Sequence, residues 1–402
     1  TGQAGVADHG GTAGTAGDGV MAKWNYVKIG DVCTVERGGS PRPIDKFITD
    51  DPNGINWIKI GDATDSMYIT ETAQKIIPEG MKKSRYVQPG DFLLSNSMSF
   101  GRPYILKIDG CIHDGWLVLR DNGGVFDKRF LYYYLSSPST YQKFKNMAVG
   151  GVVNNLNSDM VRGVTVPIPK MEEQIEIVQT LDNVSNLIFL RKQQLAKLDE
   201  LVKARFVELF IGKGYPTKTI DEVSLGKGEY GAQSASIEYD PTRPRYVRIT
   251  DINDDGTLND DVVASINPDD DEQYRLEYGD FLFARMGATV GKTFAFIAGN
   301  QIFAGYLIRY KLNQKLINPR YLFWYTKLNE YWNWVKLNQS GAAQPGINAK
   351  KYGSLRIPVP PVAEQEQFAA FVERADKSKV AVQKALDEAQ LLFDSLMQKY
   401  FG

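Results

Sequence analysis

Two glycine-rich stretches have a spacing that in other proteins holds a nucleotide phosphate. Residues 226–231 match the Gly-x-Gly-x-x-Gly pattern of a dinucleotide-binding loop. Such a loop has to open an apolar helix whose N-terminus binds the pyrophosphate, but here Ala232-Gln233-Ser234 follows. Residues 287–293 resemble a phosphate-binding loop but are one residue short between the glycines, and their counterpart, ending at Gly101-Arg102-Pro103, lacks the Lys-Thr pair. We therefore interpret both stretches as loops that bind no nucleotide.

Residue types that catalyse reactions or bind metals are scarce. The chain has two histidines, His9 and His113, and two cysteines, Cys33 and Cys111, and their spacing fits no metal site. We expect His113 to be a structural residue. The chain lacks the Gly-x-Ser-x-Gly turn of serine hydrolases and the Asn/Asp-Pro-Pro-aromatic motif of amino-methyltransferases. The sequence therefore predicts a protein that is not an enzyme and that itself holds neither a cofactor nor a metal.

The clearest pattern in the chain is an internal repeat with an offset of about 190 residues, too long for a solenoid unit. The matching segments keep their order along the chain: Ile60-Gly61-Asp62 and Ile249-Thr250-Asp251; Gly90–Leu93 and Gly279–Leu282; Gly115–Val118 and Gly305–Ile308; Val166–Pro169 and Ile357–Pro360; Glu173-Gln174 and Glu364-Gln365. A duplicated unit offers two similar surfaces related by pseudo-symmetry, which suits a protein that grips two similar objects.

Each copy begins with a β-rich part, expected over residues 21–170 and 213–361. Short apolar runs alternate there with Gly, Pro, Asn and Asp, which is typical of a compact mixed β domain. One helix is expected near residues 130–144 and its counterpart near 321–337. We expect the aromatic side chains of both helices to pack in the core rather than to stack on bases.

Each copy ends in a helix, expected over residues 171–212 and 362–402. Apolar residues step by three and four at positions 181, 184, 188, 191, 195, 198, 202, 205 and 209, with Arg at two of these, and again at 368, 372, 375, 379, 382, 386, 389, 393, 396 and 400, with Lys at one. This is a heptad seam. A helix of about 40 residues is about 60 Å long, and an apolar stripe of that length requires a partner helix.

Connectivity fixes how the two helices pair. The first helix ends near Gly212, and the second β-rich part begins at Thr219, only a few residues later. The second helix must therefore run back along the first. The predicted fold is α+β, with two pseudo-symmetric mixed β-rich domains separated by two long antiparallel coiled-coil helices.

Composition sets wide limits on function. The net charge of −1 does not by itself suggest nucleic acid, but a modest basic excess lies in the two β-rich parts and permits DNA binding. The chain has no run of 18 apolar residues, so no membrane span is expected. Two cysteines fit a reducing cytoplasm better than a disulfide framework. Residues 1–20, rich in glycine, are expected to be an appended leader or a disordered tail without a function.

The ordered segments resemble the specificity subunit of type I restriction-modification enzymes. They are Gly38-Gly39-Ser40-Pro41, Asn56–Asp62, Pro89–Leu94, Gly150–Asn157, Val166–Pro169 and Glu173-Gln174, with a second copy in Arg245–Ile252, Gly279-Asp280, Gly341–Asn348 and Ile357–Gln365. The resemblance covers Met21 to Gly402. The second half lacks the Gly-Gly-Ser-Pro loop and carries residues 226–236 instead, which implies that its domain reads a different sequence.

The resemblance implies a division of labour. Each β-rich part would be a target recognition domain that reads one half of a bipartite site in double-stranded DNA. The helices would set the gap between the halves and dock two methyltransferase subunits. Those partners would bind S-adenosylmethionine and methylate N6 of a flipped adenine. The resemblance also allows for motor and nuclease subunits, and it implies no membrane partner.

Side chains that read bases would then lie in exposed loops of both domains. Arg and Lys pair with guanine, and Asn and Gln with adenine. On this basis we select Arg37, Ser40, Arg42, Lys46, Asn96, Ser97, Arg102, Asn154 and Asn155 in the first domain, and Lys227, Tyr230, Gln233, Arg243, Arg285, Lys292, Gln339 and Gln344 in the second. At each single position the alternative is a solvated loop residue without a role.

Two other functions are compatible with the same sequence. A coiled-coil scaffold whose heads bind protein or glycan fits the low net charge, although loops rich in Arg, Asn, Gln and Ser at matching places favour DNA. A specificity subunit of a type II-like system, in which one partner chain carries both methyltransferase and nuclease, has the same features.

Overall fold

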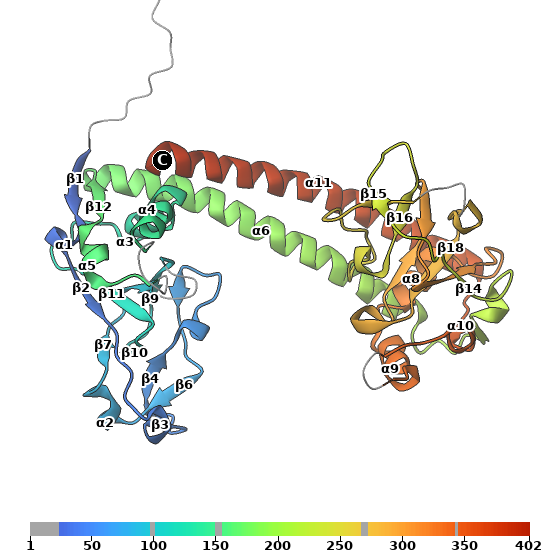
Figure 1. Cartoon of the computed structure of the whole chain (residues 1–402), viewed down its shortest axis with the longest axis horizontal. Coiled ribbons are helices and arrows are strands. Elements are labelled where there is room, and N and C mark those ends of the chain that lie inside the picture. The colour runs from blue at the N-terminus through green and yellow to red at the C-terminus, as the bar shows by residue number, and fades with distance from the viewer. Residues whose placement is uncertain (1–23, 97–100, 149–154, 267–271, 342–344) are drawn as a thin grey trace, which may run out of the picture. The chain divides into compact units, whose positions relative to one another are not determined.

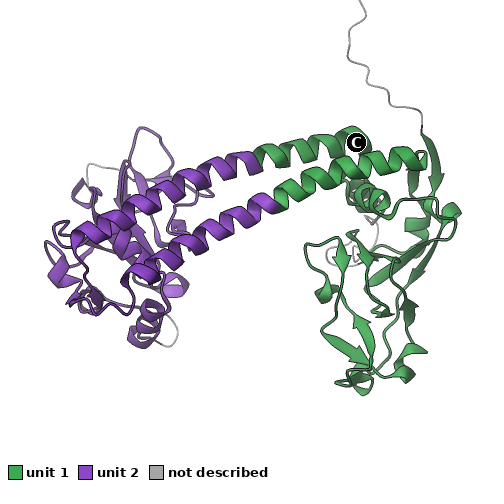
Figure 2. Ribbon diagram, turned by 180° about the vertical axis from the view of Figure 1, so that it is seen from behind, with its two compact units in different colours: residues 1–189, 387–402 green, residues 190–386 purple. Residues whose placement is uncertain are grey.

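The computed structural model describes residues 24–96, 101–148, 155–266, 272–341 and 345–402. The chain divides into two compact units, residues 1–189 with 387–402 and residues 190–386 (Figure 2). We call the part of the first unit from its first to its last strand, residues 25–168, the first head. The corresponding part of the second unit, residues 217–358, is the second head. Each unit also contains about half of each long helix.

The first head is built from two five-stranded sheets and a separate strand pair (Figure 1). One sheet has the order β2 (Cys33–Arg37), β11 (Trp116–Asp121), β8 (Phe92–Ser95), β9 (Pro103–Leu106) and β5 (Tyr68–Ile69). The other has the order β3 (Ile48–Thr49), β6 (Gln74–Ile76), β4 (Ile55–Ile58), β10 (Gly110–Ile112) and β7 (Arg85–Val87). The pair joins β1 (Asn25–Lys28) to β12 (Thr165–Ile168). Because β10 and β11 belong to different sheets, the turn at residues 113–115 connects the two sheets.

The second head repeats this topology with shorter sheets. One sheet has the order β14 (Glu229–Tyr230), β21 (Leu307–Lys311), β18 (Asp280–Ala284) and β19 (Thr293–Ala295), and the other β15 (Ile237–Glu238), β17 (Ala264–Ser265), β16 (Arg245–Val247) and β20 (Gln301–Phe303). The strand pair is β13 (Thr217–Thr219) with β22 (Arg356–Pro358). The turn at residues 304–306 connects the two sheets, as residues 113–115 do in the first head. The predicted internal repeat is therefore a repeat of fold.

The expected single helix in each head is two helices. The first head has α3 (Lys128–Ser136) and α4 (Pro138–Ala148), and the second has α8 (Pro319–Tyr325) and α9 (Asn329–Asn338). Pro138 explains the first break, because a residue before proline avoids the helical region, and Ser137 is extended. The second head has no proline there, but Leu328 is extended. The expected core packing of aromatic side chains is confirmed, since Tyr133, Tyr134, Tyr321 and Tyr325 are buried.

The shorter helices cap loops and strand ends. They are α1 (Ile29–Val32), α2 (Pro78–Met81), α5 (Ser158–Gly163) and α10 (Ala349–Gly353), with 3₁₀ turns η1 (Ile44–Lys46), η2 (Ile60–Asp62), η3 (Asp221–Val223), η4 (Ile249–Asp251), η5 (Glu272–Tyr274) and η6 (Gly287–Thr289). The repeated aspartates end η2 and η4, and each accepts a hydrogen bond from the backbone three residues earlier, Asp62 from Lys59 N and Asp251 from Arg248 N. A local turn therefore explains why this short motif appears twice.

The two long helices are α6 (Met171–Phe210) and α11 (Val362–Phe401). Every predicted seam position is buried or half-buried. In the second unit the last half of α6 packs on the first half of α11, with Phe206 and Phe368 ring centroids 5.2 Å apart. In the first unit the start of α6 shares a core with the end of α11, where Leu181, Met397 and Phe401 are buried. The antiparallel coiled coil is therefore confirmed within each unit.

The repeated Glu-Gln pairs join each long helix to its head. Gln174, fully buried, accepts from Asp127 N at 2.8 Å and donates to Val125 O and Pro169 O. Gln365 makes the same three contacts in the second unit, with Asn318 N, Leu316 O and Pro360 O. Since Asp127 and Asn318 are the N-caps of α3 and α8, each glutamine fixes a head helix against a long helix. Among the helices of the described residues, none has the length and hydropathy to cross a membrane.

Candidate nucleic-acid interface

The turn between β10 and β11 gathers four of the side chains selected from the sequence. Ser40 Oγ lies 3.0 Å from Asp114 Oδ1, and Arg42 Nη2 lies 3.3 Å from Asp114 Oδ2. The backbone oxygen of Asp114 accepts from Arg37 Nε at 3.1 Å and from Asn96 Nδ2 at 2.9 Å. These four residues come from two segments that are far apart in the sequence. We call them, with Asp114, the first cluster.

Glycine allows the loop of residues 38–42 to approach this turn. Gly38 N donates to Trp116 O at 2.9 Å and Gly39 N to Ile112 O at 3.1 Å. A Cβ atom at Gly38 would lie 2.2 Å from the carbonyl oxygen of His113, so any other residue would push the loop away. The Gly-Gly-Ser-Pro segment therefore serves to bring Ser40 and Arg42 against Asp114.

His113 has a structural role, as expected. Its Nδ1 accepts from Gly115 N at 2.9 Å, and its Nε2 lies 2.9 Å from Asp114 Oδ1. Partial burial by itself raises the pKa of Asp114, but His113, Ser40 and Arg42 outweigh it and lower that pKa below its usual value. Asp114 is therefore ionised at neutral pH, and its carboxylate accepts hydrogen bonds from the side chains of Ser40 and Arg42.

Asn96, a member of the first cluster, is only 2% exposed. The other residues selected in the first head lie outside the first cluster. Lys46 is exposed on η1, and Arg102 is exposed and pairs with Asp65 at 3.2 Å. Asn155 is exposed next to Leu156, whose backbone N donates to Asn96 O. Ser97 and Asn154 lie outside the described residues.

The equivalent turn of the second head gathers three selected side chains. Arg285, which corresponds to Asn96 in the repeat, lies with its guanidinium carbon 4.8 Å from the ring centroid of Tyr230, and its Nη1 is 3.5 Å from Gly305 O. Gln233 lies against Gly305, since a Cβ atom there would be 2.1 Å from Gln233 Nε2. We call Tyr230, Gln233 and Arg285 the second cluster. In this cluster an aromatic ring, and not a carboxylate, contacts the arginine. Ala304 stands where the first head has Asp114.

The remaining residues selected in the second head lie elsewhere. Lys227 is exposed and pairs with Asp221 at 2.5 Å, and Lys292 is half-buried and pairs with Asp254 at 2.8 Å. Arg243, half-buried, lies 3.3 Å from Asp240, and Gln339 is exposed at the C-cap of α9. Gln344 lies outside the described residues. No described contact joins these four to the second cluster.

At the same repeat position in each head, an arginine links neighbouring segments of one sheet. Arg120 on β11 pairs with Asp91 at 3.0 Å and Glu36 at 2.9 Å. Its counterpart Arg309 on β21 pairs with Asp280 at 3.5 Å and with Glu229. The arginine side chain is 29% exposed in the first head but 5% in the second. Both heads thus use one charge network as a support, with the second more deeply buried.

Sequence reasoning does not identify Asp114. An acidic residue repels phosphates, and contacts to bases are expected from side chains that donate hydrogen bonds. The internal repeat contains a signal that points to Asp114. Gly115–Val118 matches Gly305–Ile308, yet the residue before the glycine changes from Asp114 to Ala304. A position that differs between two copies, next to residues that match, marks a place where the two heads differ in chemistry.

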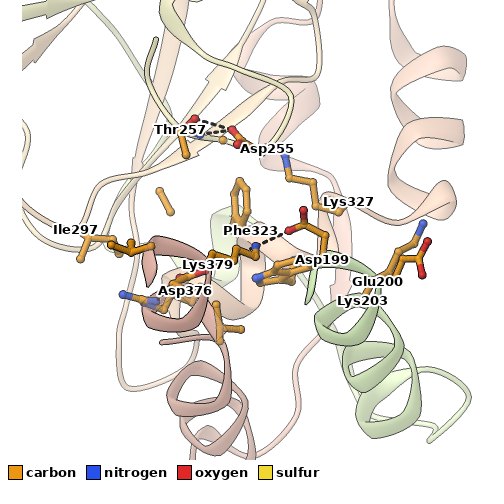
Figure 3. A pocket seen from close by; sticks show the side chains of 16 residues that line it. Asp199, Glu200, Lys203, Asp255, Thr257, Ile297, Phe323, Lys327, Asp376 and Lys379 are labelled. Atoms are coloured by element: carbon orange, nitrogen blue, oxygen red, sulfur yellow. Dashed lines mark hydrogen bonds and ion pairs between the residues drawn. The ribbon is translucent and has the colours of Figure 1, made fainter. Parts of the chain in front are cut away.

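The second unit also contains a cavity of about 640 Å³, lined by residues of α6, α8, α11 and the turn at 255–257. Figure 3 shows the ring of Phe323 between that turn and the Lys379–Asp199 pair. In its wall Arg320 pairs with Asp376 at 3.3 Å, and Lys327 Nζ donates to Asp254 O at 2.6 Å. Burial lowers the pKa of Lys327 to about 8.

This cavity does not resemble a catalytic or metal site. Arg320 and Lys379 of its wall pair with Asp376 and Asp199, and the Thr257 hydroxyl donates to Asp255 at 2.6 Å as part of a local turn. Over all described residues, no group of three His, Cys, Asp or Glu side chains could hold a metal ion. The two clusters on the head turns are therefore the stronger candidates for function.

Comparisons with known proteins agree with this architecture. A family model, described as the type I restriction modification DNA specificity domain, matches residues 21–200 and again residues 214–389. The chain is similar to the MjaIX type I restriction enzyme specificity subunit of Methanocaldococcus jannaschii, with 20% identity over 94% of this chain and 92% of the relative. It is also similar to the EcoKI specificity subunit of Escherichia coli, with 23% identity over 71% of this chain and 67% of the relative.

Two solved structures share the fold. A chain from a structure on complex assembly and conformational transition of the type I R-M system has a TM-score of 0.59 and 19% identity, covering 94% of this chain and 97% of that chain. The type I restriction-modification S subunit from M. genitalium has a TM-score of 0.56 and 15% identity, covering 96% and 98%. Because the family model matches twice in succession and spans most of the sequence, this protein belongs to the type I restriction-modification DNA specificity family.

Proposed function

We propose that the first and second heads each read one half of a bipartite site in double-stranded DNA. One observation carries this proposal: the two heads have the same topology and present polar clusters at the same turn, but the clusters differ in chemistry. Two identical surfaces would be expected to read a symmetric site. Two surfaces that share a scaffold and differ at the exposed groups are expected to read two different half-sites.

The exposed groups suit contacts with base edges. The Arg42 side chain is 81% exposed, and one of its N–H groups donates to Asp114. A guanidinium group has five N–H donors and can bind guanine O6 and N7 together. In the second head Arg285 offers the same guanidinium chemistry, and the amide of Gln233 suits adenine. A modest basic excess means that phosphate contacts by this chain alone give weak binding. Joining two weak readers gains affinity through effective concentration.

The proposed partners are two DNA methyltransferase subunits that dock on α6 and α11. Both helices bury their seam and still expose apolar side chains on other faces, namely Leu187, Phe189, Leu190, Leu201, Val207, Val380, Leu391 and Leu392. Apolar side chains exposed along a helix pair offer contacts that a docked protein partner would bury. The partners would bind S-adenosylmethionine and methylate a flipped adenine at N6. This chain would contribute recognition and no catalytic group, and motor and nuclease subunits would extend the same complex.

The proposed role of the coiled coil is to set the gap between the half-sites. The seam positions of both helices are buried or half-buried, and a stiff antiparallel helix pair would transmit a fixed distance better than a flexible linker does. The proposed compartment is the cytoplasm. Cys33 and Cys111 are both free and buried, which fits a reducing environment.

Sequencing of modified adenines in cells that express this chain with its methyltransferase partner tests the proposal. We expect one methylated motif made of two short specified halves around an unspecified gap of constant length. In vitro, the assembled complex is expected to shift duplexes that carry this motif, with an affinity that falls as salt rises. A motif without a gap, or no sequence preference in the assembled complex, would show that the heads do not act as two DNA readers.

A further inference from the structure

The carboxylate of Asp114 requires an explanation if the first head binds DNA. An ionised carboxylate on a DNA-facing surface repels phosphates and lowers affinity. Its side chain is 30% exposed, and it is ionised at neutral pH. The second head has no charge at this place, because Ala304 occupies it. A group that weakens binding by its charge and is absent from the sister head has a specific task in the first.

We infer that Asp114 is a positioning residue for base reading, whose carboxylate aims the guanidinium of Arg42. This rests on the proposed function of the heads. Arg42 has no other described contact and is 81% exposed, so a free arginine there would sample many rotamers. A rotamer-rich side chain costs about 0.5–1.5 kcal/mol to immobilise on binding. The tether at 3.3 Å reduces that loss while leaving donors free for a base.

The contacts around Asp114 fix its orientation. Oδ1 accepts from Ser40 Oγ at 3.0 Å and lies 2.9 Å from His113 Nε2, while Oδ2 accepts from Arg42. His113 is itself held by Gly115 N. The second head orients its arginine without a carboxylate, through the ring of Tyr230 under Arg285. The two heads therefore reach the same end, an aimed arginine, by different means.

The test compares Asp114→Asn with Glu79→Gln in the complex with the methyltransferase partner. Each variant removes one negative charge from the first head, and Glu79 is exposed on α2 without a described partner. Methylation rates are measured on duplexes with single base changes in either half-site. The first half-site is identified as the half whose base preference Arg285→Ala leaves unchanged.

We expect Asp114→Asn to lower discrimination at base pairs of the first half-site by about tenfold, within the range of a bidentate contact. Glu79→Gln is expected to leave discrimination unchanged. If Asp114 acts through Arg42, the double variant of Asp114→Asn with Arg42→Ala discriminates no less than Arg42→Ala alone, because the cycle then shows full coupling. A head with a general folding defect would instead lose more in the double variant.

Three results would overturn the inference while the proposed function stands. Asp114→Asn could tighten binding to all duplexes with unchanged discrimination, which would make it a repulsive charge only. It could affect both half-sites alike, or add its full effect to that of Arg42→Ala. If Asp114→Asn does not assemble, Ser40→Ala replaces it, and no change in the first half-site would again overturn the inference. By contrast, a wild-type complex without a two-part preference would refute the proposed function itself.

Discussion

In the first head Arg42 is held by the carboxylate of Asp114, whereas in the second head Arg285 lies over the ring of Tyr230. An exposed ion pair is weakened by salt, because its Coulomb energy is screened. A guanidinium over an aromatic ring keeps its packing contact in salt. The two copies of one duplicated scaffold therefore hold an arginine in two ways. The ion pair of the first head depends more on ionic strength than the cation–π contact of the second head does.

The largest expected effect comes from exchanging a whole head. Replacing residues 213–361 with those of a relative that has another target is expected to replace one half of the recognised site completely and to leave the other half unchanged. The reason is that the second cluster and its sheets lie within this segment. Methylome sequencing of the chimera checks this. A simultaneous change of both halves would contradict independent heads.

The next effect concerns the coiled coil. Seven residues inserted in each helix, beside Leu195 and Leu386, keep the heptad seam continuous and lengthen it by about 10 Å at 1.5 Å per residue. At about 3.4 Å per base pair, the gap is expected to grow by roughly three base pairs, with lower affinity because the helical phase of DNA changes. Selection from random duplexes measures the gap. An unchanged gap would refute the spacing role and leave the heads as readers.

Three residues inserted in α6 alone serve as the contrasting variant. They interrupt the heptad seam, because three is less than one repeat. We expect weaker assembly with the methyltransferase partner rather than a new gap. Assembly that equals the wild type, measured by sedimentation, would show that the seam is not needed for docking.

The supporting arginines are expected to differ in cost between the heads. Arg309→Met leaves Asp280, 3% exposed, without its cation, and breaking such a buried pair costs about 3–5 kcal/mol. Arg120→Met, at a side chain 29% exposed, is expected to cost about 1 kcal/mol. Hydrogen exchange of β18 and β21 against β8 and β11 reports each head separately. Equal protection losses would show that burial does not distinguish the two networks.

Alanine at Arg37, Arg42 and Arg102 tests the loops of the first head. Each bidentate base contact contributes about 1–3 kcal/mol of discrimination, so we expect a loss in the first half-site only. The structure refines this expectation, because Arg37 and Arg42 belong to the first cluster and Arg102 pairs with Asp65 instead. Arg102→Ala alone is therefore expected to have the smallest effect of the three. Unchanged half-site affinity and preference in the triple variant would remove this loop from the interface.

The smallest expected effect is a pH dependence of stability that Lys327 gives to the second unit. Burial lowers the pKa of Lys327 from 10.5 to about 8, and its counterpart in the first repeat is Ser136. Below pH 8 the lysine is charged in both states, so its burial penalty is constant. Between pH 8 and 10.5 the unfolded state binds more protons, so the free energy of unfolding from this group rises with pH.

Lys327→Met removes this dependence and serves as the comparison. Between pH 7 and 10 the stability of the wild type relative to the variant is expected to increase by of order 1 kcal/mol, after allowing for solvent screening. Hydrogen exchange of α8 at the two pH values, corrected for intrinsic rates, measures it. A difference that is constant with pH would mean that Lys327 keeps its ordinary pKa.

The fold was largely predictable from the sequence, because its signals are periodic. The heptad seam gave both long helices and their direction, and the ordered segments gave the repeat. The break at Ser137-Pro138 is predictable from the proline, although the apolar pattern of this segment predicts one continuous helix. The break at Leu328 was not, since nothing local in that segment disfavours a helix and its cause is tertiary.

The candidate site was only partly predictable. Residues 37–42 and Asn96 were chosen as separate loops, and only the three-dimensional structure shows that they meet at one turn. Lys46, Lys227 and Lys292 are predicted to read guanine because of their residue type, but residue type does not fix position, and Lys292 pairs with Asp254. Asp114 could not be found by a search for donors, because its role depends on a contact between residues 72 apart in sequence.

The central claim is that the two clusters read different halves of one site. Its most direct measurement is selection of bound duplexes from a random pool by the complex with its methyltransferase partner, carried out with the wild type, Arg42→Ala and Arg285→Ala. We expect two specified halves at a constant gap, with Arg42→Ala degrading one half and Arg285→Ala degrading only the other. Loss of preference in the same half by both variants, or in neither, would contradict it.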